Sequence, residues 1–244
     1  MFVQCIGSGD AFGAGGRFNS AYYVKCAKTK LLLDCGGTTL VGLKKFKIPV
    51  DDLDAVLISH LHGDHFGGLP FILCELLVSG KRKKPLTIIG PVDTEARTKE
   101  ALNCFYPGIA IKRNSPVKFL TYVAKEVLEF NSVKITPYPA IHSDKTNPHC
   151  VRIEGDGKVL AYSGDSGWTD NLLTISANAN LFICEGSFYE VPFKQHINIK
   201  ELLRKVDQIT AAKIVITHVG EEVLRNIKQV PLTIAEDGMI LMDE

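Results

Sequence analysis

Six residues, 60–65, with the sequence HLHGDH, constrain this chain more than any other stretch. They include three histidines and follow the short apolar run 55–59, which predicts a buried strand. The histidines therefore lie on a loop that leaves a strand end, where binding residues commonly sit on a rigid scaffold. Imidazole and carboxylate groups are ligands of borderline divalent ions such as zinc. A solvated histidine-rich loop is the alternative, but clustered metal-ligand residue types directly after a strand favour a metal site.

The order of the residues within this stretch suggests two ions rather than one. Asp64 and His65 cannot easily reach an ion that His60 and His62 already bind. Gly63 between the two pairs frees the backbone for a tight turn. Two ions about 3.5–4 Å apart can share a bridging hydroxide, and such a hydroxide is a nucleophile at neutral pH.

The composition fits one large α/β domain that spans residues 1–244. A hydrophobic content of 45% is enough for a substantial core. The formal net charge is only +1, so the chain as a whole has no electrostatic attraction to nucleic acid. The basic run 81–84 predicts a solvated turn, and a role in nucleic-acid binding is the alternative.

The sequence predicts a cytoplasmic protein with no membrane contact. Residues 1–5 contain no basic residue and no long apolar run, so no secretory signal is expected. No apolar run approaches the ~20 residues that a membrane helix needs. The seven cysteines are scattered and form no C-x-x-C, as is typical of free thiols in a reducing compartment. We expect four of them to be core residues: Cys5, Cys35, Cys150 and Cys184.

Strand and helix patterns alternate along both halves of the chain. Strands are predicted at 2–6, 21–25, 31–33, 133–136, 150–153, 159–162 and 181–184, and buried strands at 86–90 and, last in the chain, at 213–217. Segment 116–130 predicts a pair of short strands. Helices are predicted at 69–79, at 94–105 with Asp93 as its cap, near 171–177, and after Asn198. The glycine-rich loop 7–16 is either a flexible turn or part of the site. This order predicts two sheets packed face to face with helices outside.

The hexapeptide 60–65 is the H-x-H-x-D-H signature of the metallo-β-lactamase superfamily, and the chain resembles that family along nearly its whole length. The resemblance implies an α/β fold, the metallo-β-lactamase αββα sandwich. His62 stands where related diiron oxygen reductases carry a carboxylate, which favours hydrolysis over redox chemistry. Within the superfamily the chain looks most like tRNase Z and its small phosphodiesterase relatives. Asp34, in an Asp-x-Gly segment, resembles a support beneath the metal loop.

The resemblance also implies a complete set of ligands for two divalent ions, zinc or alternatively manganese. A lone histidine or aspartate after a strand is more often structural, and it is the family order that gives these residues a metal role. The first ion would be held by three histidines, His60, His62 and His142. The second would be held by Asp64, His65 and His218, and Asp165 would bridge the two ions.

Two short segments resemble tRNase Z and favour phosphodiester chemistry. Glu185 with the three residues after it resembles H-E-A-T-F, although Cys184 replaces the leading histidine, and His196 occupies the place of the histidine in H-S-T. The resemblance implies a catalytic set of Asp64, Glu185 and His196, in which His196 is the general acid and Glu185 orients it. The alternative is that Glu185 and His196 are ordinary polar loop residues.

The spacing of the motifs limits the expected substrate. Only twenty-two residues separate His142 from Asp165, so there is no room for the arm with which tRNase Z grips tRNA. We therefore expect a metal-dependent phosphodiesterase that acts on a small phosphodiester or a short nucleotide. A lactonase or thioesterase on the same fold is the first alternative, and a metal-bound, non-catalytic binding protein is the second. The apolar segment 69–77 also suggests a homodimer.

Overall fold

The computed structural model describes residues 1–80, 82 and 84–243 of this chain. Its strands are β1 (Phe2–Gly7), β2 (Ala21–Cys26), β3 (Thr29–Leu33), β4 (Ala55–Leu57), β5 (Leu86–Gly90), β6 (Val117–Thr121), β7 (Leu128–Phe130), β8 (Val133–Pro139), β9 (His149–Gly155), β10 (Lys158–Tyr162), β11 (Leu181–Glu185), β12 (Ile214–Thr217), β13 (Thr233–Ile234) and β14 (Ile240–Met242). Its α-helices are α1 (Thr39–Lys45), α2 (Gly63–Phe66), α3 (Leu69–Ser79), α4 (Thr94–Phe105), α5 (Asp170–Ser176), α6 (Ile199–Lys205) and α7 (Glu221–Arg225). Short 3-10 helices are η1 (Ala14–Gly16), η2 (Val50–Asp52), η3 (Asp144–Thr146), η4 (Val206–Gln208) and η5 (Ile227–Gln229).

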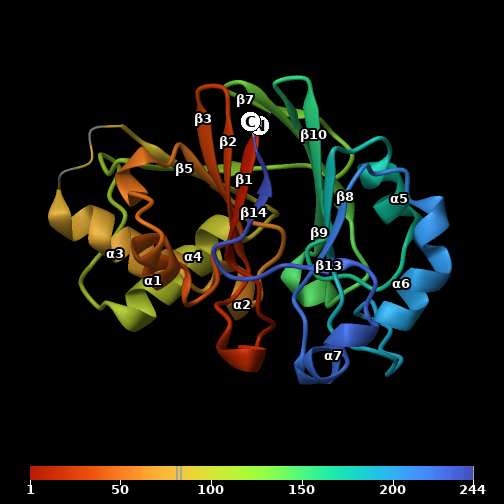
Figure 1. Cartoon of the computed structure of the whole chain (residues 1–244). Helices are drawn as coiled ribbons and strands as arrows, with labels where there is room; N and C mark the ends of the chain where they lie inside the picture. Colours follow the sequence, from red (N-terminus) through yellow and green to blue (C-terminus); the bar gives the residue numbers. More distant parts are fainter. Residues whose placement is uncertain (81, 83, 244) are drawn as a thin grey trace.

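The strands form two seven-stranded sheets that pack face to face (Figure 1). Their strand orders are β14-β1-β2-β3-β4-β5-β6 and β13-β12-β11-β10-β9-β8-β7. Helices α1, α3 and α4 cover the outer face of the first sheet, and α5 and α6 cover that of the second (Figure 1). One core joins the sheets, and two further cores lie under the helices. The predicted αββα sandwich is confirmed.

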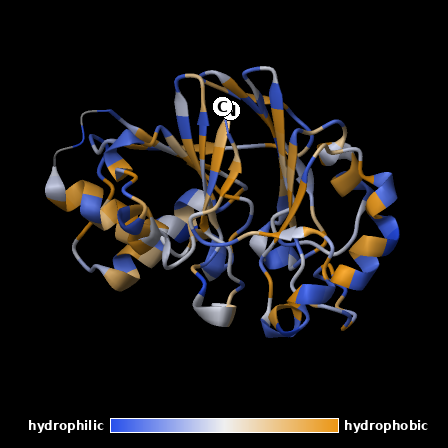
Figure 2. Cartoon of the chain, viewed as in Figure 1, coloured by the Kyte–Doolittle hydropathy of each residue, from blue (hydrophilic) through white to orange (hydrophobic). Residues whose placement is uncertain are grey.

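Strand β3 shows why the central strands are continuous apolar runs. Leu31 and Leu33 point into the core between the sheets, whereas Leu32 points into the core beneath the helices. Because both faces of the sheet are covered, alternate residues cannot be polar, and the strand loses the usual period of two. The hydrophobic colouring of the inner strands in Figure 2 follows this rule.

Helix α3 has the predicted bounds. Pro70 lies in its first turn, and Gly80 ends it in the left-handed conformation with φ of 60°. Its buried residues recur at helical spacing and pack on the first sheet: Leu69, Ile72, Leu73 and Leu76. Val78 on the other side of α3 is 68% exposed. The structure describes a single chain, so pairing through this helix stays a prediction.

One local prediction, that Asp93 caps the helix at 94–105, is wrong because of its backbone conformation. Asp93 precedes α4 but has φ of 70°, and its side chain accepts no capping hydrogen bond. Thr94 Oγ1 instead donates to Pro91 O at 2.7 Å. The two short strands predicted in segment 116–130 are present and belong to different sheets: β6 extends the first sheet beside β5, and β7 extends the second beside β8.

The chain continues as strands beyond the segment predicted to be the last strand. After β12, β13 extends the second sheet, and β14 crosses to pair antiparallel with β1 at the edge of the first sheet. These strands are two and three residues long, too short to give a periodic signal in the sequence.

The basic run 81–84 lies partly outside the described residues, which omit positions 81 and 83. Arg82 is buried, and its guanidinium donates to the carbonyl of Val50 at 3.0 Å. Lys84 pairs with Asp54 at 2.9 Å. These two cations therefore hold their own loop and η2 in place. Among the described residues no helix is both long and apolar enough to span a bilayer.

Candidate metal centre

Strand direction brings distant residues to one edge of the sandwich. Strands β10, β11 and β12 run parallel, so their carboxyl ends meet, and Asp165, Glu185 and His218 lie at or just after these ends. His142 follows β8, which is antiparallel to β9 and hence runs in the direction of β10. His60 follows β4 in the other sheet. Ligands at the carboxyl ends of strands are the usual arrangement in sheets of this kind.

The seven predicted ligands come together in two groups that share Asp165. In each group the donor atoms lie within 4.8 Å of one another. The first group is His60, His62, His142 and Asp165, and the second is Asp64, His65, Asp165 and His218. This is the predicted division between two ions. Metal binding by each residue stays a proposal.

Inside the two groups the donor atoms crowd together as ligands of a cation would. His62 Nδ1 lies 2.9 Å from His142 Nε2 and 3.3 Å from His60 Nε2. In the second group His65 Nε2 lies 3.1 Å from Asp165 Oδ1 and 3.3 Å from Asp64 Oδ2. Although the buried atoms His65 Nε2 and Asp165 Oδ1 lie 3.1 Å apart, neither forms a hydrogen bond within the described residues, and the other ring nitrogen of His65, Nδ1, faces Asp34. Because buried polar atoms are normally paired, this donor set fits divalent metal ions.

The opposite ring nitrogens hold the histidines in the matching tautomer. Ser59 Oγ donates to Asp34 at 2.7 Å, so it can only accept from His60 Nδ1, 3.1 Å away. Ser187 Oγ donates to Glu185 at 2.7 Å and stands in the same relation to His218 Nδ1, at 3.0 Å. Each serine therefore links one histidine to a buried carboxylate and directs the Nε2 atom of that histidine into the site.

Asp34 is the central support that the resemblance implied. Its carboxylate accepts four hydrogen bonds of 2.7 Å, from Ser59 N, Ser59 Oγ, His65 Nδ1 and Tyr162 Oη. The residue is fully buried and has φ of 58°, a conformation that aspartate and asparagine tolerate better than most residues. Asp34 thus joins the metal loop to the second sheet without facing the pocket.

Replacing Asp34 by asparagine is expected to weaken metal affinity by about 10- to 100-fold, because the hydrogen bond that orients His65 loses its charged acceptor. Competition with a chromophoric chelator measures this affinity. Asp93→Asn is the matched control, since Asp93 has φ of 70° and lies outside the donor groups. Equal affinity of wild type and Asp34→Asn would show that Asp34 supports folding alone.

Burial lowers the pKa of the histidines in the site, whereas nearby carboxylates raise it. Burial, reinforced by nearby His65, puts the pKa of His60 well below its usual value, and burial also lowers the pKa of His62 and His142. Burial opposes charge at His218 as well, but Asp165 and Asp64 outweigh it and raise the pKa of His218 to about 9. The first group therefore holds neutral imidazoles at neutral pH, the form that ligates metals.

Glu185 and His196 meet beside the two donor groups. His196 Nδ1 lies 3.1 and 3.2 Å from the two Glu185 carboxylate oxygens. The His196 ring lies 4.8 Å from that of His142 and stacks on His218 at 5.9 Å. Burial lowers the pKa of His196, but the Glu185 carboxylate outweighs this and raises the pKa above its ordinary value. The two residues are therefore not independent loop polars.

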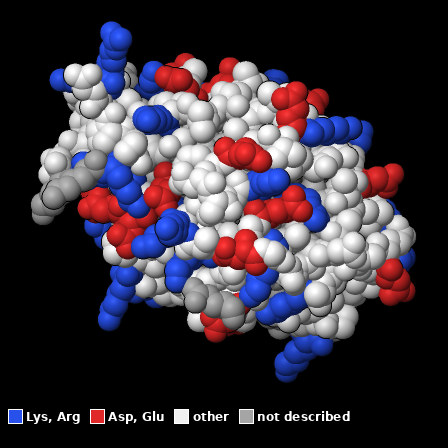
Figure 3. Space-filling model, turned by 90° about the horizontal axis from the view of Figure 1, so that it is seen from above, with Lys and Arg blue, Asp and Glu red and all other residues white. Residues whose placement is uncertain are grey.

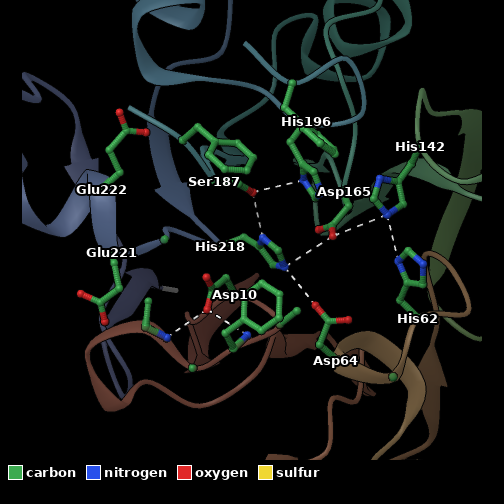
Figure 4. A pocket seen from close by; sticks show the side chains of 18 residues that line it. Asp10, His62, Asp64, His142, Asp165, Ser187, His196, His218, Glu221 and Glu222 are labelled. Atoms are coloured by element: carbon green, nitrogen blue, oxygen red, sulfur yellow. Dashed lines mark hydrogen bonds and ion pairs between the residues drawn. The ribbon is translucent and has the colours of Figure 1, made fainter. Parts of the chain in front are cut away.

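A pocket of about 670 Å³ opens over these residues (Figure 4). Its walls include one loop whose role the sequence left open and one residue that the sequence did not place in the site. The first is loop 7–16, of which residues 10–14 line the pocket. The second is Ser187, which contacts Glu185, His196 and His218. The sequence signal for Ser187 was its place two residues after Glu185 at a strand end.

The fold and the donor set define a metallo-hydrolase of the metallo-β-lactamase fold, related to ribonuclease Z and phosphodiesterases. The chain belongs to the family of the anti-Pycsar protein Apyc1, whose family model matches residues 1–238.

Relatives match nearly the whole chain. YhfI of Bacillus subtilis (strain 168), described as a probable metallo-hydrolase, is 29% identical over 225 residues, 89% of this chain and 86% of YhfI. The anti-Pycsar protein Apyc1 of Bacillus phage BSP38 is 26% identical over 232 residues, 90% of this chain and 89% of the phage protein. The crystal structure of YhfI aligns with a TM-score of 0.81 at 25% identity over 98% of both chains. Human tRNase Z, short form, aligns with a TM-score of 0.79 at 20% identity over 99% of both chains, which shows a common fold.

Proposed function

We propose that this chain is a phosphodiesterase that hydrolyses a small phosphodiester or short nucleotide with two divalent ions, zinc or manganese. The pairing of Glu185 with His196 beside the metal ligands carries the proposal. Phosphodiester hydrolysis expels an alkoxide, which needs a proton in the transition state, and an imidazole held by a carboxylate is a usual donor. Thioesters have less need of such a donor, because a thiolate is less basic than an alkoxide and leaves more readily.

The proposed roles follow from position. His196 gives its Nε2 proton to the leaving oxygen, and Glu185, which accepts from Nδ1, fixes the ring and stabilises the imidazolium. Glu185 is itself held by Ser166 N at 2.6 Å and by Ser187. Asp64 completes the second donor group and borders the pocket. Divalent ions in this cluster would activate a water and neutralise phosphate charge.

The size of the substrate is limited by what lies between His142 and Asp165. This segment contains η3, the hairpin β9–β10 and the short connections between them, with no inserted arm. The hairpin turn at 156–157 has positive φ at both residues, 54° and 66°, as in a two-residue type I′ turn. A pocket of about 670 Å³ has room for a nucleotide-sized ligand. These features support a small substrate over folded RNA.

Metal analysis and a substrate panel test the proposal together. Protein purified without chelator is expected to contain up to two transition-metal ions per chain. With each metal added back, it should hydrolyse bis(p-nitrophenyl) phosphate and, in a wider panel, cyclic nucleotides, cyclic sugar phosphates or short oligonucleotides. Turnover of thioesters or lactones alone would identify the alternative hydrolase. Bound metal without any turnover would indicate a binding protein.

A further inference from the structure

Two loops that border the pocket each present an exposed phenylalanine. Phe12 in loop 7–16 is 94% exposed, and Phe193 in the loop after β11 is 47% exposed. Both line the same pocket as His196 and His218. A scattered exposed apolar residue needs no explanation, but two large rings at the mouth of one pocket indicate a binding surface.

The loop that carries Phe12 is held in place although its tip is exposed. Asp10 Oδ1 accepts hydrogen bonds from Phe12 N at 3.1 Å and from Ala14 N at 2.9 Å. Gly15 has φ of 66°, and its N–H donates to Glu221 on α7 at 3.0 Å. The backbone of Phe12 is thus fixed from both sides while the ring stays in solvent.

The loop that carries Phe193 forms a continuous aromatic wall. The ring of Phe193 lies 5.5 Å from that of Phe188 and 5.6 Å from that of His196. The backbone N–H of Tyr189 in this loop donates to Glu222 of α7 at 2.9 Å. Adjacent glutamates at the start of α7 therefore tether the two loops, one each, and fix both aromatic walls relative to the metal ligands.

The charge of the pocket limits what can enter between these walls. Among the described residues no lysine or arginine lines the pocket. Three carboxylates outside the two ligand groups do line it, Asp10, Glu221 and Glu222, and the two glutamates lie on the side away from His62 and His142 (Figure 4). Elsewhere the charges are mixed: the end seen from above in Figure 3 carries cations and carboxylates side by side. A ligand with several phosphates would be repelled at the pocket mouth.

We propose that Phe12 and Phe193 form an aromatic slot that binds a flat, uncharged ring of a phosphodiester carrying a single negative charge. The inference rests on the proposed phosphodiesterase function and narrows its substrate class. The ring, a nucleobase or another aryl group, stacks against the slot while the phosphodiester lies over the metal ligands. The carboxylates of Asp10, Glu221 and Glu222 select against any further phosphate.

The slot is tested with two cyclic phosphodiesters that differ only in the ring. One is 3′,5′-cyclic AMP, and the other carries a methoxy group in place of the base. Wild type should prefer cyclic AMP in kcat/KM. Phe12→Ala and Phe193→Ala should each lower this preference by about 10-fold, as expected for loss of base stacking. Phe12→Tyr should retain it. Phe105→Ala is the matched control, because Phe105 is 53% exposed on α4 and lies outside the pocket.

The charge selection has its own pair of probes. The dinucleotide ApA carries one charge, and pApA carries an added 5′-phosphate. Wild type at low salt should prefer ApA, and the double variant Glu221→Gln, Glu222→Gln should lower this preference by about 10-fold. Glutamine keeps an oxygen that can accept from Gly15 N and Tyr189 N, so the loops stay tethered.

Failure of the slot and failure of the proposed function give different results. Absence of turnover of bis(p-nitrophenyl) phosphate and all other phosphodiesters would refute the phosphodiesterase. In that case calorimetry with metal-depleted protein tests the slot separately from catalysis. Equal affinity for the two cyclic compounds would overturn the slot. In an active enzyme, an unchanged preference in Phe12→Ala and Phe193→Ala would overturn the slot, and equal use of ApA and pApA by wild type would overturn the charge selection.

Discussion

Asp165→Asn is expected to reduce bound metal to less than one ion per chain and to lower kcat by about 10³-fold. Asp165 is the one residue common to both donor groups, and its side chain is 3% exposed. Burial raises the pKa of its carboxyl, but His218 and His65 outweigh this and hold the pKa well below its ordinary value. Asparagine keeps the shape but removes the charge that offsets two cations. A loss of several kcal/mol in electrostatic stabilisation of the transition state corresponds to a fall in kcat of this size.

The measurement is elemental analysis together with turnover of bis(p-nitrophenyl) phosphate. Asp207→Asn is the control, because Asp207 in η4 is exposed and lies outside both donor groups and the pocket. His62→Ala, which alters only the first group, should retain about one ion. If Asp165→Asn still bound two ions with wild-type affinity, Asp165 would not be the bridging ligand.

His196→Ala is expected to keep its bound metal and to lose about 10²–10⁴-fold in turnover of phosphodiesters with alkyl leaving groups. The loss should be small for p-nitrophenyl esters, because p-nitrophenolate departs without a proton. Glu185→Gln should lower the same rates, since the amide cannot stabilise the imidazolium as the carboxylate does. The comparison is kcat for an alkyl and a p-nitrophenyl ester of the same phosphate, with metal content measured on each sample.

His149→Ala is the control for this variant. His149 belongs to none of the donor groups; it begins β9, and its Nδ1 donates to Asn147 O at 2.9 Å. It should therefore retain turnover of both esters. His196, Glu185 and His218 also lie close enough to hold an ion. Metal loss in His196→Ala would make it a ligand, and equal losses for both esters would make it a structural residue.

The sequence determined the parts of the site that local motifs encode. Three histidines and an aspartate follow a buried strand within six residues, and imidazole and carboxylate groups are ligands of divalent ions such as zinc. The bounds of α3 were equally local, because proline can begin a helix and glycine can end one in the left-handed conformation. Glu185 and His196 could be paired only because short segments around them resemble a known family, since they lie on separate segments of the chain.

The tertiary structure decided what depends on distant contacts. Asp93 has the residue type of a helix cap, but its φ is 70° and its side chain accepts no capping hydrogen bond, while the Thr94 hydroxyl donates to Pro91 O. Strand β14 has three residues, and only its pairing with β1 makes it a strand. Asp34 and Ser187 have short polar side chains that the sequence alone cannot distinguish from turn residues. They became supports of the centre because folding buried them, and a buried carboxylate or hydroxyl must find partners. The order of motifs along the chain predicts which side chains reach the site. The packing of the two sheets decides which atoms form hydrogen bonds with those side chains.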